Sequence, residues 1–126
     1  MAIEKYNDLL NYSIKLKVGK VEKYGNHIYC IKLSSVPKQL HFLRGRYGIF
    51  FEVFINKMDI LANKINDKFQ TLSYYGMNKK LLENFVLKNH LTGIDRIVPF
   101  GKALDMSHIW DGINLIKTMS RIIKIS

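Results

Sequence analysis

Cys30 is the only cysteine of the chain and its only candidate for thiolate chemistry. A cysteine attacks a carbonyl carbon as the thiolate, which needs a partly open, electropositive surrounding that lowers the pKa of the thiol. Cys30 instead lies within the alternating run from His27 to Leu33, with no glycine turn or helix start beside it. The pattern favours a buried strand cysteine over a nucleophile, so the sequence indicates no catalytic residue.

Arg44 and Arg46 are candidates for holding a phosphate. A guanidinium forms paired hydrogen bonds to phosphate oxygens, and here two arginines flank a glycine in the run Arg44–Gly48. The run precedes an apolar stretch, whereas a dinucleotide-binding turn follows a strand and opens a helix. We therefore expect either a contact to the phosphate of a phosphate-bearing ligand, or a solvated or salt-bridged turn. No cofactor is expected to bind this chain alone.

The sequence predicts no metal site. The histidines lie far apart without the spacing of metal ligands, and a single cysteine cannot complete a zinc cluster. Each histidine is therefore expected to be structural or exposed, at positions 27, 41, 90 and 108.

Composition indicates a folded chain with a basic surface. Its 126 residues and hydrophobic share of 48% suffice for one domain with a buried core. The net charge of +10 comes mainly from scattered lysines, which is typical of solvated faces, with a phosphate-bearing partner as the alternative. No apolar run approaches the roughly 20 residues of a membrane-spanning helix, and the N-terminus lacks the apolar block of a signal peptide. We expect no membrane span and a cytoplasmic location.

Residues 1–43 are predicted to form a helix followed by a β-rich segment. Apolar residues recur at helical spacing near the N-terminus, and alternating runs follow. The pair Gly25-Asn26 is typical of a hairpin turn. The expected elements are a helix over 3–12 and strands over 14–18, 21–24, 27–33 and 39–43.

Residues 44–126 have the pattern of an α/β segment, expected to form one compact unit with the part before it. Strands and helices alternate, which favours parallel strand pairs with right-handed crossovers. Asn56 and Asn78 are placed to cap the two helices, and Gly93 follows the second. The expected order is a strand over 49–55, a helix over 57–68, a strand over 69–75, a helix over 79–90 and a strand over 94–98.

The C-terminal part begins with a turn at Pro99-Phe100-Gly101, because proline fixes one backbone dihedral and glycine tolerates the next. A loop follows that contains the only tryptophan, Trp110. Apolar residues from Ile113 onward then recur at helical spacing and predict a short helix. An apolar edge strand is expected over residues 122–125.

Two stretches carry a resemblance to a known family: IDRIVPFGKALD over residues 94–105 and HIWDGINLIKTMSR over residues 108–121. They resemble the C-terminal end of bacterial long-chain acyl-CoA reductases, the fatty-acid reductases of bioluminescence, in the aldehyde dehydrogenase superfamily. The similarity covers about two thirds of the chain, from near Arg44 to Ser126. It implies a partial aldehyde-dehydrogenase-like sheet with a strand–helix–strand–helix–strand core and an N-terminal β-hairpin. The implied reaction is reduction of a long-chain acyl thioester to an aldehyde, with a cysteine nucleophile and NADPH as hydride donor.

The resemblance also implies a substrate pocket. Pro99-Phe100-Gly101 is similar to a loop beside the substrate tunnel of aldehyde dehydrogenases, although Lys102 replaces a second glycine. Phe100 and Trp110 would then line the acyl-chain side of a pocket, with plain core packing as the alternative.

Three further residues have two readings each. Arg96 and Asp111 would pair to hold the loop, or Asp111 would cap the following helix, which we favour. Glu52 is similar to part of a cofactor-contacting motif of the family. Of the two alternatives, a cofactor contact or a strand glutamate paired with a nearby lysine, we favour the second.

Together these features predict a C-terminal fragment or subunit of an NADPH-dependent long-chain acyl-CoA reductase, inactive alone because nucleophile and cofactor motif are missing. Expected partners are long-chain acyl-CoA or an acyl-enzyme in the complete enzyme, and self-association or an upstream partner chain. The alternative is a small interaction or assembly module without catalysis, which the apolar run 122–125 favours. A basic nucleic-acid-binding domain fits less well, because aromatic and basic residues do not interleave on one face.

Overall fold

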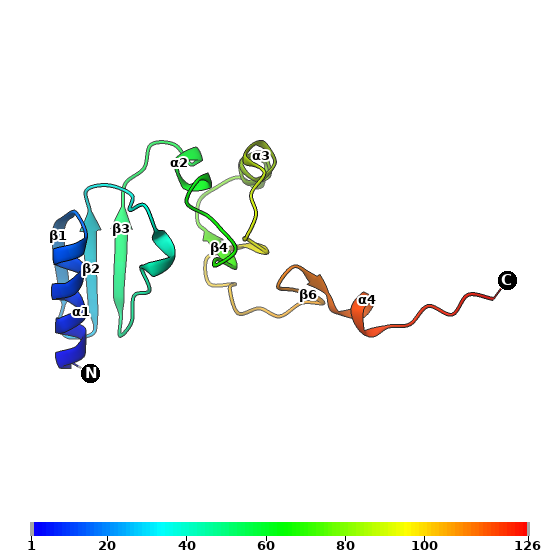
Figure 1. The fold of residues 1–126 in the computed structure, drawn as a ribbon, viewed down its shortest axis with the longest axis horizontal. Coiled ribbons are helices and arrows are strands. Elements are labelled where there is room, and N and C mark those ends of the chain that lie inside the picture. Colours follow the sequence, from blue (N-terminus) through cyan, green and yellow to red (C-terminus); the bar gives the residue numbers. More distant parts are fainter. Residues whose placement is uncertain (1, 126) are drawn as a thin grey trace. The chain divides into compact units, whose positions relative to one another are not determined.

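The computed structural model describes residues 2–125. It divides into a first unit, residues 1–60, and a second unit, residues 61–126 (Figure 1). Helices and small sheets occur in both, so the expectation of an α/β chain is confirmed at this coarse level. The units divide between Ile60 and Leu61, farther along the chain than the change of pattern near residue 43.

The first unit is a three-stranded sheet with a helix over it. Strand β2 lies at the centre, antiparallel to β1 and parallel to β3. The elements are α1 (Ala2–Lys15), β1 (Val18–Tyr24), β2 (Ile28–Leu33), the 3-10 helix η1 (Leu40–Phe42) and β3 (Ile49–Val53).

The core of the first unit lies between α1 and one face of this sheet (Figure 1). Side chains alternate along β2, so every second residue points towards the helix. Tyr12 of α1 packs edge-on against Phe51 of β3, with ring centroids 4.8 Å apart. The buried residues of this core are Leu9, Tyr29, Ile31, Leu33 and Ile49.

The hairpin expected around Gly25-Asn26 is confirmed, and two expectations beside it are wrong. Residues 14–15 continue α1 instead of starting a strand, because the amide of Leu16 still donates to the carbonyl of Tyr12 at 2.9 Å. Residues 40–42 form η1 instead of an extended piece, closed by a hydrogen bond from the amide of Leu43 to the carbonyl of Leu40.

The second unit holds a two-stranded parallel sheet, one long helix and a small C-terminal hairpin. Strands β4 and β5 pair in parallel, and β6 and β7 pair antiparallel. The elements from residue 59 on are α2 (Asp59–Ala62), β4 (Thr71–Tyr74), α3 (Lys79–Asn89), β5 (Arg96–Pro99), β6 (Ile109–Trp110), β7 (Ile113–Asn114) and α4 (Leu115–Met119).

Helix α3 follows its sequence signals closely. The side chain of Asn78 accepts a hydrogen bond from the amide of Lys80 at 2.9 Å, so the predicted N-cap is confirmed. Leu82 and Phe85 are buried on one face. The helix ends at His90, which takes the left-handed conformation that C-caps need, before Gly93 is reached.

The predicted helix over 57–68 is reduced to α2. The helix ends at Ala62, and farther along the side-chain oxygen of Asn66 accepts from the amide of Lys68 at 3.0 Å in a local, non-helical hydrogen bond. Gly93 lies so close to the carbonyl of Asn66 that a β-carbon there would clash. Beyond the end of α2, the backbone at Asn66 thus packs closely against Gly93.

The five predicted elements between Ile49 and Val98 occur in order, but their strands do not form one sheet. Strand β3 pairs with β2, and β4 pairs with β5. An aldehyde-dehydrogenase-like sheet running through β3, β4 and β5 is therefore not seen within residues 2–125. Pattern identified the strands, whereas their partners depend on contacts distant in sequence.

The C-terminal segment is shorter in secondary structure than its pattern indicated. The helix expected from Ile113 is the five-residue α4, and residues 121–125 form no strand. An edge strand requires a neighbouring strand for its hydrogen bonds, and none lies beside this segment among the described residues.

Across residues 2–125, every helix is too short or too polar to cross a membrane.

Candidate functional site

Arg96, at the start of β5, holds together the loop between β5 and β6. Its guanidinium donates to the carbonyl oxygen of Ala103 at 3.2 Å and to that of Asp105 at 2.7 Å. It also lies over the ring of Trp110, with its central carbon 4.5 Å from the ring centroid. Pairing of Arg96 with Asp111 was the less favoured of two alternatives, and Arg96 holds the loop instead through two backbone carbonyls and the indole.

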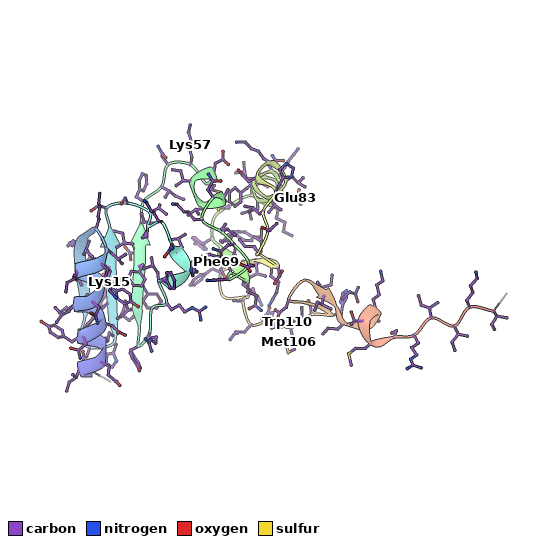
Figure 2. The ribbon with its side chains drawn as sticks, viewed as in Figure 1. Lys15, Lys57, Phe69, Glu83, Met106 and Trp110 are labelled. Atoms are coloured by element: carbon purple, nitrogen blue, oxygen red, sulfur yellow. The ribbon has the colours of Figure 1, made fainter. Side chains whose placement is uncertain are left out.

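Trp110 is presented by the β6–β7 hairpin (Figure 2). The turn residues Asp111 and Gly112 both have positive φ, 50° and 73°, which is the geometry of a type I′ hairpin turn. The amide of Leu115 donates to the carbonyl of His108 at 2.8 Å and closes the hairpin. Trp110 is half-buried beneath Arg96, so the hairpin fixes the position of its ring.

Asp111 does not cap α4, contrary to expectation. Its carboxylate accepts a hydrogen bond from the side-chain amide of Gln70, at 2.5 Å. The N-cap of α4 is Asn114, whose side chain accepts from the amide of Lys117 at 3.0 Å. Asp111 thus ties the hairpin turn to the residue before β4, a tertiary contact that spacing along the chain could not reveal.

The turn at Pro99-Phe100-Gly101 forms as expected. The amide of Lys102 donates to the carbonyl of Pro99 at 3.0 Å, and Gly101 has φ of 85°. Phe100 is 77% exposed, so core packing does not account for its side chain. The loop from this turn to Trp110 can be followed in Figure 2, where Met106 and Trp110 are labelled.

A groove of about 460 Å³ lies beside this loop. Arg96 lines it together with residues from β5 and from the loop, and the expected pocket residues Pro99, Phe100, Gly101 and Trp110 do not. The lining residues are Asp95, Arg96, Ile97, Val98, Lys102, Asp105, Met106, Ser107 and Ile109. Lys102 and Asp105 form an ion pair at 3.0 Å at its edge. The groove presents cationic, anionic, hydroxyl and apolar groups, which are suited to binding a ligand.

Arg44 and Arg46 are both exposed and belong to the first unit, in the loop before β3. The carbonyl of Arg44 accepts from the hydroxyl of Tyr12 at 3.3 Å. Glycine is required at positions 45 and 48, because a β-carbon there would meet the backbone of Ile49 or His27. The two guanidinium groups are the cationic side chains that this turn presents to solvent.

Cys30 lies in β2 as predicted, but it is half-buried rather than buried. It projects from the face of the sheet opposite the core, because the buried positions of β2 are the alternating ones. Burial of the thiol raises its pKa, and a hydrogen bond to the Glu52 carboxylate raises it further. The thiol is therefore protonated at neutral pH, the opposite of what a nucleophile needs. Glu52 itself is exposed beside Lys32, its partner in the β2–β3 register.

The same face carries a charge cluster that the sequence analysis missed. Glu22 accepts hydrogen bonds from Lys20 and Lys32, each at 2.9 Å. These two bonds lower the pKa of the Glu22 carboxyl to about 2. The contact from Lys20 follows from spacing two apart on one strand, whereas that from Lys32 requires the hairpin register.

Lys5 is a second residue that the sequence analysis missed. It is only 2% exposed, and its Nζ donates to the carbonyl oxygens of Asn26 at 2.9 Å and His27 at 2.7 Å. The same ammonium lies 4.2 Å from the ring centroid of Tyr29. Lys5 lies four residues before Leu9 and so on the same, inner face of the helix. This spacing was the sequence signal from which its burial could have been predicted.

The first unit also has a groove of about 980 Å³ at the end of α1. Its floor is mainly apolar and its rim carries three lysines, Lys15, Lys17 and Lys38.

Among residues 2–125, no three histidine, cysteine or acidic side chains gather closely enough to hold a metal ion. No protein-family model, curated protein or solved structure matches this chain.

Proposed function

We propose that this chain supplies the C-terminal part of an NADPH-dependent long-chain acyl-CoA reductase, as a fragment or subunit that is inactive alone. The observation that carries the proposal is the assembly of β5, the Pro99–Gly101 turn and the Trp110 hairpin around Arg96. These are the stretches that resemble the reductases, and their conspicuous residues contact one another. The contact between Arg96 and Trp110 supports the resemblance, because both residues then act in one local structure.

The loop between β5 and β6 presents an apolar surface to solvent. Phe100, Leu104 and Met106 are all largely exposed. Exposed apolar groups gathered in one segment are typical of a surface that another chain or domain covers. This supports a role in completing a larger enzyme, in which the loop would face the acyl substrate or the catalytic part.

The reaction itself would belong to the partner chain. A reductase of this type needs a thiolate and a bound nicotinamide cofactor, and Cys30 has a raised pKa and lies on the open face of a sheet. NADPH supplies the hydride in the family, and we assign its binding to the partner chain. The contribution of this chain is accordingly structural, through the loop that Arg96 holds.

A reconstitution experiment tests this proposal. A bacterial long-chain acyl-CoA reductase shortened before its Asp-Arg-Ile-Val-Pro stretch is mixed with this chain, and NADPH oxidation with tetradecanoyl-CoA is followed. The chain alone should show no turnover, and the mixture should bind and regain activity. Phe100→Lys should weaken both effects, whereas Lys57→Gln in the first unit should leave them unchanged. Acyl-CoA-dependent NADPH oxidation by the chain alone, or no binding and no activity in the mixture, would refute the proposal.

A small interaction module without a reductase partner is the second candidate. The exposed isoleucines of residues 122–125 favour it. Under this alternative the chain would self-associate and would not bind the shortened reductase. Light scattering across concentration, with and without the reductase, separates the two. The scattered lysines should in either case give only weak DNA binding that is lost as salt rises.

A further inference from the structure

The C-terminal segment, residues 113–125, is rich in apolar side chains that nothing in its own unit covers. Five of these side chains are exposed by well over half: Ile116 64%, Met119 84%, Ile122 93%, Ile123 86% and Ile125 93%. Keeping so many aliphatic groups in water is unfavourable by about 25 cal/mol for each Å² of apolar surface. The segment is therefore suited to bind a further surface.

Its residues are arranged for a helix rather than for a strand. Leu115, Met119 and Ile122 recur at i, i+4 and i+7, and Ile116 and Ile123 extend the same face. Lys117, Arg121 and Lys124 recur at the same spacing on the opposite face. Ile113 and Ile125 fall outside the apolar face, at the two ends of the segment. In a strand, by contrast, Arg121, Ile123 and Ile125 would share one face, mixing charge with apolar groups.

The structure already contains the first turn of this helix. Asn114 caps it, and Leu115–Met119 are helical as α4. The helix stops at Ser120, whose backbone is extended with φ of −103° and ψ of 153°. Short isolated helices are marginal in water, so the apolar face needs a surface before the helix can continue to Ile125.

Charge and side-chain type select that surface. Between Gly112 and Ser126 there are three basic residues and no acidic one, so an anionic surface is favoured. The apolar face has only aliphatic side chains and lacks the tryptophan or tyrosine anchors that dominate protein interfaces. Such a face is suited to a broad, unshaped apolar layer below negative charges. A basic amphipathic helix of this kind lies in the plane of a lipid surface.

We propose that residues 114–125 form one amphipathic helix that binds in the plane of an anionic lipid surface. The aliphatic face enters the boundary between headgroups and acyl chains, and Lys117, Arg121 and Lys124 contact the anionic headgroups. This role does not depend on the reductase proposal, because it uses residues beyond the loop that Arg96 holds. The net charge of +10 of the whole chain adds long-range attraction to the same surface.

Co-sedimentation of the full chain with vesicles tests this inference. Vesicles of phosphatidylcholine with one quarter phosphatidylglycerol should bind the chain, and pure phosphatidylcholine vesicles should bind it much more weakly. Replacing the three basic residues together, as K117Q/R121Q/K124Q, should weaken binding on the order of 100-fold, since each contributes about a factor of five near the surface. Raising the salt concentration should weaken binding of the unmodified chain as well.

Two variants, each of which swaps two residues of the segment, test whether binding requires a helical face or only a basic and apolar composition. R121I/I122R keeps composition and charge but moves an arginine onto the apolar face, and it should reduce binding at least tenfold. S120K/K124S also keeps composition and charge, and leaves both faces intact, so it should bind as the unmodified chain does. Hydrogen exchange with vesicles present should slow at the amides of residues 120–125 in the unmodified chain and in S120K/K124S only.

Three outcomes would overturn the inference. The first is no preference for phosphatidylglycerol. The second is equal binding by the two exchanged variants. The third is self-association that protects residues 114–125 without vesicles, together with no vesicle binding, which would make a second copy of the chain the partner.

Discussion

The guanidinium of Arg96 lies over the ring of Trp110, 4.5 Å from the centroid, while its nitrogens donate to two carbonyl oxygens of the loop between them. One side chain thus connects the start of β5 with a hairpin fourteen residues later in the chain. Arginine suits this position because its planar guanidinium lies against the indole while two of its nitrogens, held in one rigid plane, donate to different carbonyls.

Replacing Arg96 should therefore loosen the loop and expose Trp110. Arg96→Ala should lower the free energy of unfolding by about 2 kcal/mol, and Arg96→Lys by about 1 kcal/mol. Trp110 is the only tryptophan, so a red shift of its fluorescence reports the loop directly. Arg121→Ala, at an exposed residue, is the matched control and should change neither quantity. Unchanged fluorescence in Arg96→Ala would show that the contact does not order the loop.

Lys5 should be important for stability although it is a charged residue. Lys5→Met keeps the side-chain length but leaves the carbonyl oxygens of Asn26 and His27 without their donor. The expected loss is about 2 kcal/mol in the free energy of unfolding, from urea denaturation. Lys15→Met, at an exposed position of the same helix, should change it by less than about 0.5 kcal/mol. Equal effects of the two substitutions would contradict the role given to Lys5.

Glu22 should make stability depend on pH in the acid range. Its pKa is lowered from 4.5 to about 2 by hydrogen bonds from Lys20 and Lys32. Because the folded state holds the charged form, the contribution is fully present above pH 4.5 and is lost as pH falls towards 2. Glu22→Gln should therefore have a lower urea midpoint than the unmodified chain at pH 6, and the two should converge at pH 2. A difference that stays constant between these pH values would be inconsistent with the lowered pKa.

Cys30 should react slowly with alkylating agents. Burial and the Glu52 carboxylate both raise the pKa of its thiol, which reduces the thiolate fraction at pH 8. Glu52→Gln removes the negative charge and should speed iodoacetamide labelling several-fold at that pH. Glu83→Gln, in the second unit, is the control and should leave the rate unchanged. Labelling that is as fast as that of a free thiol in the unmodified chain would favour a reactive cysteine after all.

Local signals predicted the elements whose residues act on near neighbours. Asn78 caps α3 because its side chain reaches an amide two residues away, and Gly25-Asn26 turns the hairpin by its own dihedral preferences. The Pro99–Gly101 turn formed for the same reason. The prediction of a helix over 57–68 failed, because α2 ends at Ala62 although the apolar spacing from Met58 onward had favoured a longer helix.

The candidate site was predictable only in its members, not in its contacts. The sequence placed Arg96 and Asp111 in one loop, and each bonds elsewhere: Arg96 to backbone carbonyls and Trp110, Asp111 to Gln70. Likewise Lys5 lay on the inner face of a helix, but the carbonyls that satisfy it belong to the hairpin turn.

The sequence alone determined which segments are helix, strand or turn near strong caps and turns, because those preferences act within a few residues. It also determined the basic and aliphatic faces of residues 114–125, which depend on spacing only. The tertiary structure alone decided that β3 pairs with β2 rather than with β4, and that Cys30 projects from the open face of its sheet. Strand pairing joins residues far apart in sequence, and a shift of one residue in a strand reverses every side chain, so no local pattern could fix either result.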